Sequence, residues 1–182
     1  MRIVGGSARG RVLKAPSDDT RTRPTADRVR QTLFNVLGQV LPEIEVLDLY
    51  AGTGALALEA LSRRAATALL VDSDREAQGL CRENAAALGL FDRVEVWPMP
   101  ADRAIDKLLA EARRFDLIFA DPPYGAKVAA SLCGKVGALL APEGRFCVEH
   151  DKREEAPEQV AGLSRIDQRL FGDTAVSIYA PE

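Results

Sequence analysis

Short apolar runs alternate with amphipathic stretches along most of the chain. From residue 44 onward, each apolar run is followed by a longer stretch whose apolar residues recur at helical spacing. The alternation predicts strands at 44–49, 68–72, 94–97, 115–120 and 145–149, and helices at 55–63, 75–88, 101–113 and 128–140. Nearly continuous apolar strands separated by helices are typical of a parallel sheet covered on both faces.

The C-terminal part of the chain breaks this alternation. Residues 164–171 and 174–179 flank Gly172 and Asp173, a pattern that predicts an antiparallel hairpin with a tight turn. We therefore expect an α/β fold with a mostly parallel, seven-stranded sheet, helices on both faces and a C-terminal antiparallel hairpin.

Residues 1–41 follow a third pattern. Residues 2–4 and 11–13 flank Gly5-Gly6, which predicts a small basic hairpin. Pro24 then favours a helix that starts at Thr25 and ends at Pro42. Its predicted apolar stripe consists of Val29, Leu33, Val36, Leu37 and Val40. We divide the chain into an N-terminal extension, residues 1–41, and a main domain, residues 42–182.

Charge is distributed unevenly between these two parts. The 182 residues include 24 Lys and Arg against 27 Asp and Glu, which gives a net charge of −3. Residues 1–35 hold eight of the basic and three of the acidic side chains, so the other 147 residues hold 16 and 24. The net charge excludes a uniformly basic nucleic-acid binder, but the basic N-terminal segment can still attract phosphates locally.

The rare residue types exclude several kinds of site. Cys81, Cys133 and Cys147 lie far apart without a Cys-x-x-Cys pair, and His150 is the only histidine. We therefore expect neither a disulfide framework nor a metal site. No apolar stretch reaches the ~18 residues that a membrane span needs. A cytoplasmic protein without a membrane partner is the resulting expectation.

A glycine loop follows the first predicted strand of the sheet. Gly52 and Gly54 let the backbone turn sharply after Asp48 and approach a ligand closely. Asp72 closes the next strand, where a carboxylate can accept both hydroxyl groups of a ribose. This pattern fits dinucleotide binders and other adenosine binders alike. Asp102, after the third strand, either accepts a hydrogen bond from an adenine amino group or serves as a first-turn acid of the next helix.

The motif Asp121-Pro122-Pro123-Tyr124 directly follows the apolar run 115–120. Two successive prolines remove two backbone donors and leave carbonyl acceptors beside a carboxylate. An aspartate oxygen and a proline carbonyl can together accept the two N–H groups of an exocyclic amine on a nucleobase. This arrangement directs the nitrogen lone pair toward an electrophilic methyl group, and Tyr124 would stack on the base.

At these residues the chain resembles the class I S-adenosylmethionine-dependent methyltransferases, and among them the bacterial small-subunit ribosomal RNA guanine-N2 methyltransferase D family. The resemblance covers essentially the whole chain and rests on residues 2–11, 23–35, 47–56, 58–63, 115–118 and 121–124. The Asp-Pro-Pro-Tyr motif is shared with DNA adenine and other amine methyltransferases, whereas residues 23–35 are much more specific. Arg64 stands where the family commonly has glycine, at the end of a predicted helix.

The resemblance implies a Rossmann-like fold with S-adenosylmethionine as the cofactor, held by Asp48, Tyr50, Ala51, Gly52, Thr53, Gly54, Asp72, Ser73 and Asp102. It implies direct methyl transfer to a guanine N2 atom, with the amine engaged by Asp121, Pro122, Pro123 and Tyr124. It also implies that the N-terminal extension binds RNA through Arg9, Arg11, Arg23, Thr25 and Arg28, and that residues 23–30 close over the cofactor. The partner would be ribosomal RNA within a partly or fully assembled small subunit.

Other functions are compatible with parts of this pattern. An amine methyltransferase acting on another RNA or on DNA adenine would use the same motifs. A NAD-dependent oxidoreductase would use Gly52, Gly54 and Asp72, but it leaves residues 121–124 without a role. A non-catalytic RNA-binding domain would leave Asp48 and Asp121 unexplained.

Overall fold

The computed structural model of the chain describes residues 1–16, 24–123 and 128–182; the side chains of residues 24–26 and 128 also lie outside this description. Its strands are β1 (Glu45–Leu49), β2 (Thr67–Asp72), β3 (Val94–Pro98), β4 (Phe115–Ala120), β5 (Leu140–Asp151), β6 (Gln159–Val160), β7 (Leu163–Phe171) and β8 (Thr174–Pro181). Its helices are α1 (Pro24–Leu37), α2 (Ala55–Ser62), α3 (Arg75–Ala87), α4 (Ala101–Ala110) and α5 (Val128–Val136), with short 3₁₀ turns at Phe91–Arg93 and Gly137–Leu139.

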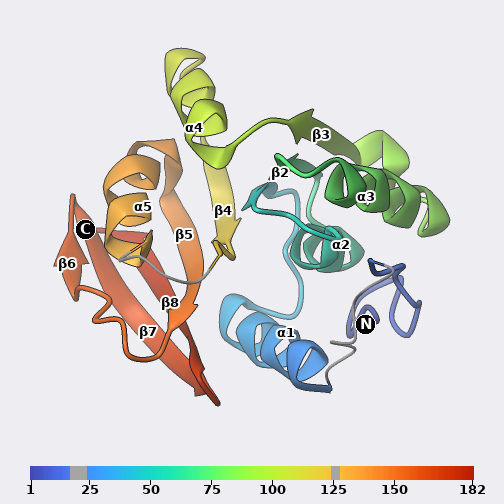
Figure 1. Ribbon diagram of the computed structural model, residues 1–182, viewed down its shortest axis with the longest axis horizontal. Helices are drawn as coiled ribbons and strands as arrows, with labels where there is room; N and C mark the ends of the chain where they lie inside the picture. Colours follow the sequence, from blue (N-terminus) through green and yellow to red (C-terminus); the bar gives the residue numbers. More distant parts are fainter. Residues whose placement is uncertain (17–23, 124–127) are drawn as a thin grey trace.

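The strands of the described residues form one mixed, eight-stranded sheet (Figure 1). The strand order is β3-β2-β1-β4-β5-β8-β7-β6. Pairing is parallel from β3 to β5, and antiparallel between β5 and β8, β8 and β7, and β7 and β6. The predicted α/β class and the C-terminal hairpin are confirmed. The expected number of strands was one too few because the two-residue β6 was not predicted.

Helices cover both faces of this sheet, as the alternating pattern predicts. Successive strand residues point to opposite faces, so Val46 belongs to the core beneath α1, α2 and α3, whereas Leu47 belongs to the core beneath α4 and α5 (Figure 1). Within the described residues, no helix is both long and apolar enough to cross a membrane.

The N-terminal helix is shorter than predicted. It ends at Leu37 because Gly38 has a φ of 113°, outside the helical region, and the Gly38 N–H closes the last turn onto the Phe34 carbonyl. The expected apolar stripe is therefore wrong at its C-terminal end, where Val36 and Val40 are 38% and 55% exposed. Phe34 is fully buried instead and packs against Phe119 of β4 at a centroid distance of 5.9 Å.

Two further predicted helices also end early. The prediction runs helix α4 to residue 113, but Ala112 has a φ of 52° and the helix stops at Ala110. Helix α5 ends at Val136, where a 3₁₀ turn leads directly into β5 at Leu140. Periodicity alone missed both ends because the apolar spacing continues past the last helical turn.

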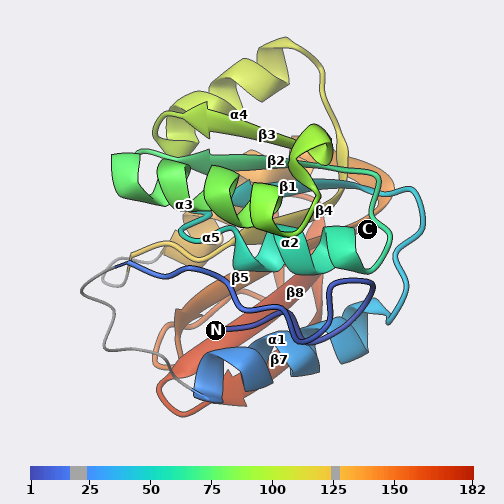
Figure 2. The same ribbon diagram turned by 90° about the vertical axis from the view of Figure 1, so that its right-hand side faces the viewer.

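The predicted hairpin at the N-terminus is confirmed and packs on α2 (Figure 2). The contact between the hairpin and α2 is centred on the buried carboxylate of Glu59, which accepts hydrogen bonds from the N–H groups of Val4 (2.8 Å) and Gly5 (2.7 Å). The Arg63 Nε atom donates to the same carboxylate at 2.9 Å. Two backbone amides and a guanidinium therefore neutralise and hydrogen-bond a charge that is costly to bury alone.

Close packing on α2 explains the Gly5-Gly6 pair. A Cβ atom on Gly5 would lie 2.2 Å from an Arg63 nitrogen, and one on Gly6 would lie 1.9 Å from the Ser62 carbonyl oxygen. Gly6 also has a φ of 73°, in the left-handed region that favours glycine. Only residues without a side chain allow the hairpin this close to the end of α2.

Helix α2 ends in the left-handed conformation expected of a glycine, although Arg64 occupies the position. Arg64 has a φ of 82°, and the Ala65 N–H donates back to the Ala60 carbonyl at 3.0 Å. The Arg64 carbonyl accepts from Glu43 N–H, which ties the turn to the chain before β1. The cap geometry is therefore kept with arginine, at a local cost of about 1–2 kcal/mol in backbone strain.

We expect Gly6→Ala to destabilise the protein more than Gly10→Ala. Gly10 has a φ of 83° but no atom within 4 Å of an added Cβ, so its variant reports backbone strain alone, roughly 1–2 kcal/mol. Gly6→Ala adds a clash with the Ser62 carbonyl, worth a further ~1–3 kcal/mol. Urea unfolding monitored by circular dichroism measures both. Equal losses in the two variants would contradict the packing explanation.

Candidate functional site

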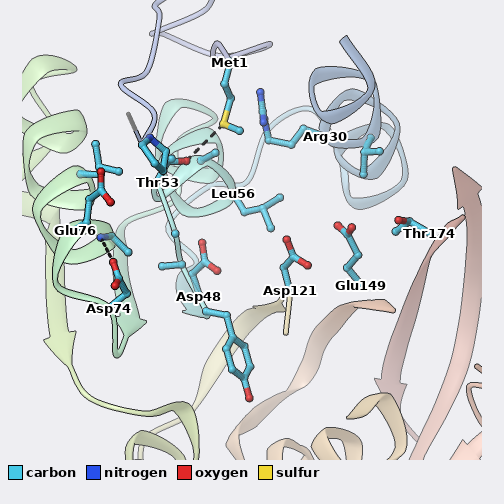
Figure 3. A pocket seen from close by; sticks show the side chains of 18 of the residues that line it. Met1, Arg30, Asp48, Thr53, Leu56, Asp74, Glu76, Asp121, Glu149 and Thr174 are labelled. Atoms are coloured by element: carbon cyan, nitrogen blue, oxygen red, sulfur yellow. Dashed lines mark hydrogen bonds between the residues drawn. The ribbon is translucent and has the colours of Figure 1, made fainter. Parts of the chain in front are cut away.

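A pocket of about 540 Å³ opens at the carboxyl ends of the parallel strands (Figure 3). Its walls come from the end of β1, the loop before α2, the start of α3, the ends of β4 and β5, and the turn between β7 and β8. Met1 and Pro16 of the N-terminal segment and Arg30 of α1 complete it. This is the edge of a parallel sheet where ligands bind in open α/β folds.

The glycine loop has the geometry that close approach to a ligand requires. Gly52 and Gly54 have φ values of 55° and 78°, and Gly54 caps the N-terminus of α2. A Cβ on Gly54 would lie 2.9 Å from the Leu70 side chain, so this glycine allows the helix to pack on β2. A Cβ on Gly52 would meet no atom within 4 Å, and Gly52 lines the pocket together with Ala51 and Thr53.

Asp48 lies at the end of β1 with its side chain directed into the pocket (Figure 3). It is 2% exposed, and one oxygen accepts the Ala57 N–H in the first turn of α2 at 3.3 Å. Loss of hydration raises the pKa of this carboxyl to about 8; the Ala57 amide opposes the shift, while Asp121 and Asp72 add to it. A cationic ligand group placed here would favour the ionised form and bind to it.

Asp72 supports the loop instead of facing the pocket. Its Oδ2 atom accepts the Gly52 N–H at 2.9 Å, and its Oδ1 atom accepts the Asp74 N–H at 2.8 Å. Asp74 in turn caps α3 by accepting the Ala77 N–H at 2.9 Å. Of the described residues here, Asp74 and Ala77 line the pocket, whereas Asp72 and the exposed Ser73 do not. The predicted ribose contact of Asp72 stays a prediction.

Asp102 lies in the first turn of α4, which agrees with the first-turn acid, one of the two roles considered from the sequence. It is exposed and forms an ion pair with Lys135 of α5 at 2.6 Å. It lies outside the pocket lining but close enough to the Tyr50 hydroxyl to raise that group's pKa, after the larger effect of burial. The structure thus places Asp102 next to the Tyr50 wall, and its adenine contact stays a prediction.

Asp121 directly follows β4 and lies beside Asp48 in the pocket (Figure 3). Partial loss of hydration raises its pKa to about 7, and the carboxylate of Glu149 contributes to the shift. Pro122 is buried, which anchors the backbone after Asp121, and Pro123 is exposed. Tyr124 lies outside the described residues.

Glu149 and Arg30 are charged pocket residues that were not among the individual site residues expected from the sequence. Glu149 of β5 lies next to Asp121, on the side away from Asp48 (Figure 3). Arg30 of α1 is 4% exposed and donates to the Arg2 carbonyl and to Asp27, both at 2.6 Å. Its buried Nε atom has no hydrogen-bond partner among the described atoms. This Nε atom lies 4.0 Å from Oε2 of Glu59, so Arg30 belongs to the ion pairs around Glu59 and brings positive charge to the pocket wall.

Of the residues expected to bind RNA, the described ones, Arg9, Arg11 and Arg28, do not line the pocket. Arg9 and Arg28 are exposed. Arg11 is exposed too, but one guanidinium nitrogen donates to the Ala87 carbonyl at the end of α3 at 2.7 Å. Arg23 and the side chain of Thr25 fall outside the described residues. The RNA contacts of all five stay predictions.

Comparison with known proteins assigns the family. The sequence model of a family described as conserved hypothetical protein 95 matches residues 1–180. The chain belongs to this family. It is 35% identical over 184 residues to ribosomal RNA small subunit methyltransferase D of Escherichia coli, which covers 100% of the chain and 90% of that protein. It is 33% identical over 154 residues to the protein of the same name from Haemophilus influenzae, covering 84% and 79%.

Solved structures agree with this assignment. A hypothetical protein from Thermus thermophilus matches with a TM-score of 0.81 and 32% identity, over 98% of both chains. A structure described as a putative methyltransferase from Escherichia coli matches with a TM-score of 0.85 and 33% identity, over 100% of this chain and 98% of that one. The resemblance that the sequence indicated is therefore confirmed at the level of the family, and the Rossmann-like methyltransferase fold at the level of the structure.

The pocket residues fit S-adenosylmethionine, the cofactor expected from the sequence. A buried carboxylate at Asp48 suits the positive charge of its methionine part, and the Arg30 side chain in the pocket lining brings positive charge near its carboxylate. The open face at Gly52 leaves room for backbone contact with the ligand.

We expect the affinity for S-adenosylmethionine to increase as the pH rises from 6 to 8. With a pKa of about 8, the Asp48 carboxyl is protonated in the ligand-free pocket, and a cationic ligand must displace this proton. The dissociation constant should fall by up to roughly tenfold per pH unit and level off above pH 8. Isothermal titration calorimetry across this range measures it.

Two variants separate the carboxyl groups in this experiment. Asp48→Asn should bind more weakly and lose the Asp48 part of the slope, whereas Asp121→Asn should retain it. Identical slopes in the wild type and in Asp48→Asn would show that another group controls the pH dependence.

Proposed function

We propose that the chain transfers a methyl group from S-adenosylmethionine to the exocyclic N2 atom of a guanine in small-subunit ribosomal RNA. The observation that carries this proposal is the position of Asp121 in the same pocket as Asp48 and the glycine loop. A cofactor site and an acceptor for amine N–H groups thereby lie at neighbouring strand ends, β1 and β4. The names of the full-length relatives support ribosomal RNA as the substrate.

The sheet sets the geometry of the transfer. β1 and β4 are adjacent parallel strands in which Asp48 pairs with Phe119, so Asp121 emerges two residues further toward the carboxyl edge of the sheet than Asp48, and both side chains line the same pocket. Asp48 holds the cationic part of the cofactor, which supplies an electrophilic methyl group when bound. An oxygen of Asp121 accepts one N–H of the guanine amine, and the Pro122 carbonyl accepts the other. The nitrogen lone pair then faces the methyl carbon.

Asp121 also suits the proton balance of the reaction. A bond forms between N2 and the methyl carbon while the carbon–sulfur bond breaks and leaves its electron pair on sulfur. The nitrogen then loses a proton. With a pKa of about 7, the Asp121 carboxylate can accept this proton and return it to water near neutral pH. No covalent intermediate with the chain is required.

Labelling identifies the substrate and the modified atom. The chain is incubated with S-adenosylmethionine carrying a radiolabelled methyl group and with unmodified small subunits, naked small-subunit RNA or DNA. Nucleoside analysis should place the label in N2-methylguanosine from the RNA-containing substrates. Label in N6-methyladenosine would overturn the base assignment and keep the enzyme class. Label in DNA alone would overturn the RNA assignment.

Asp121→Asn should abolish most of this transfer while the cofactor still binds. The amide retains the shape of the carboxylate but accepts fewer hydrogen bonds and takes up no proton, so we expect kcat to fall roughly 10²–10⁴-fold. Affinity for S-adenosylhomocysteine should change little. Asp106→Asn, an exposed carboxyl on α4, is the matched control and should keep the wild-type rate. Full activity in Asp121→Asn would remove Asp121 from the mechanism.

The exposed arginines of the N-terminal extension should determine the salt dependence of RNA binding. In the double variant Arg9→Gln/Arg28→Gln, the slope of log affinity against log salt should fall by roughly 0.7–0.9 for each phosphate that is no longer neutralised. Filter binding across a salt series measures the slope. Arg103→Gln, exposed on α4 at the opposite face of the sheet, is the control. An unchanged slope in the double variant would place the RNA elsewhere.

A further inference from the structure

A second carboxylate stands beside Asp121 in the pocket. β4 and β5 are parallel neighbours with Ala120 paired to Val148, so the residues that follow this pair, Asp121 and Glu149, lie at the same level. Both side chains line the pocket, and both point into it from the strand ends on which they lie (Figure 3). Their charges interact, since Glu149 raises the pKa of Asp121.

The sheet order arranges the pocket residues in a row. Asp48 lies on β1, Asp121 follows β4, Glu149 lies on β5, and Thr174 begins β8 (Figure 3). The glycine loop adjoins Asp48 at one end of this row. The other end, beyond Asp121, is bounded by Glu149, Thr174 and Phe171. With the cofactor at the glycine loop, the space for the substrate base is on the Glu149 side.

The edge of guanine that carries the reactive amine matches this pair of carboxylates. Guanine presents N1–H and both N2–H donors side by side, whereas adenine presents a lone pair at N1 next to its amine. Asp121 can accept only part of this set. A carboxylate beside it is placed to accept the remaining donor, N1–H.

We propose that Glu149 is the residue that selects guanine, by accepting the N1–H group while Asp121 holds the N2 amine. The inference rests on the proposed function, because it assigns the base specificity of the same site. It gives Glu149 direct contact with the substrate. A base with a lone pair at N1 would place two acceptors face to face at Glu149 and lose the hydrogen bond.

A change in base preference tests the role of Glu149. The substrate is small-subunit RNA carrying either guanine or 2-aminopurine at the position that the wild type labels. 2-Aminopurine keeps the N2 amine but has a lone pair at N1. The wild type should methylate guanine at least tenfold more efficiently, as kcat/KM. Glu149→Gln, whose amide can donate to that lone pair, should lower the guanine to 2-aminopurine ratio by at least tenfold.

Two further variants separate recognition from structure. Glu149→Asp keeps a carboxylate and should retain the preference for guanine at a reduced rate. Glu143→Gln, at an exposed position of the same strand, should behave as the wild type. Affinity for S-adenosylhomocysteine and the melting temperature should match the wild type in all variants that are compared. If Glu149→Gln differs from the wild type in cofactor affinity or melting temperature, Glu149→Asp decides the matter. Loss of the guanine preference in Glu149→Asp, with wild-type affinity for S-adenosylhomocysteine, would overturn the proposal.

The outcomes distinguish this inference from the function on which it rests. If the wild type produces N2-methylguanosine but Glu149→Gln keeps the wild-type base ratio, Glu149 does not select the base, and the proposed function stands. In that case a shift only in the pH profile would show that Glu149 acts through the charge of Asp121. If the wild type produces another methylated nucleoside or none, the proposed function itself fails.

Discussion

The buried carboxylate of Glu59 is the interaction on which the rest of the architecture depends. Its side chain is fully enclosed, and an isolated charge there would cost several kcal/mol. The backbone amides of Val4 and Gly5 and the Arg63 guanidinium satisfy it. Arg63 also lies over the ring of Phe34 at 4.8 Å, so one ionic cluster joins the N-terminal hairpin, α1 and α2. Removing the Arg63 guanidinium would leave the buried carboxylate with Arg30, whose Nε atom lies 4.0 Å from Oε2, as its remaining cation.

A second buried polar residue extends this connection to the pocket. The Asn84 side chain on α3 exchanges hydrogen bonds with the backbone of Lys14 and also donates to the Thr53 carbonyl in the glycine loop. The N-terminal segment is therefore attached both to α2 and to the loop expected to hold the cofactor. Met1 contacts Thr53 through its sulfur, at 3.5 Å from the hydroxyl. The basic segment is thus also part of the pocket wall.

Much of the sheet was predictable because its central strands are buried on both faces and read as apolar runs. Asp48 and Asp121 could be identified because each adjoins the carboxyl end of such a run, where parallel strands present ligand-binding groups. Glu149 also closes an apolar run, 145–149, but neither a glycine loop nor a proline motif adjoins it, so the sequence did not mark it as a site residue. Glu59 could not be recognised as a buried centre, since its pair with Arg63 looks like an ordinary helical i,i+4 pair and its other hydrogen bonds come from backbone amides 54 and 55 residues away.

The position of β8 has a consequence for how the chain reaches its native state. β8 is the last strand along the sequence, yet it lies between β5 and β7. While β1 to β5 are already available for pairing, the outer edge of β5 has open backbone donors and acceptors until the final hairpin docks. An open edge of this kind also pairs with other chains. Docking of residues 163–181 onto β5 is therefore the step that closes this edge against pairing with other chains.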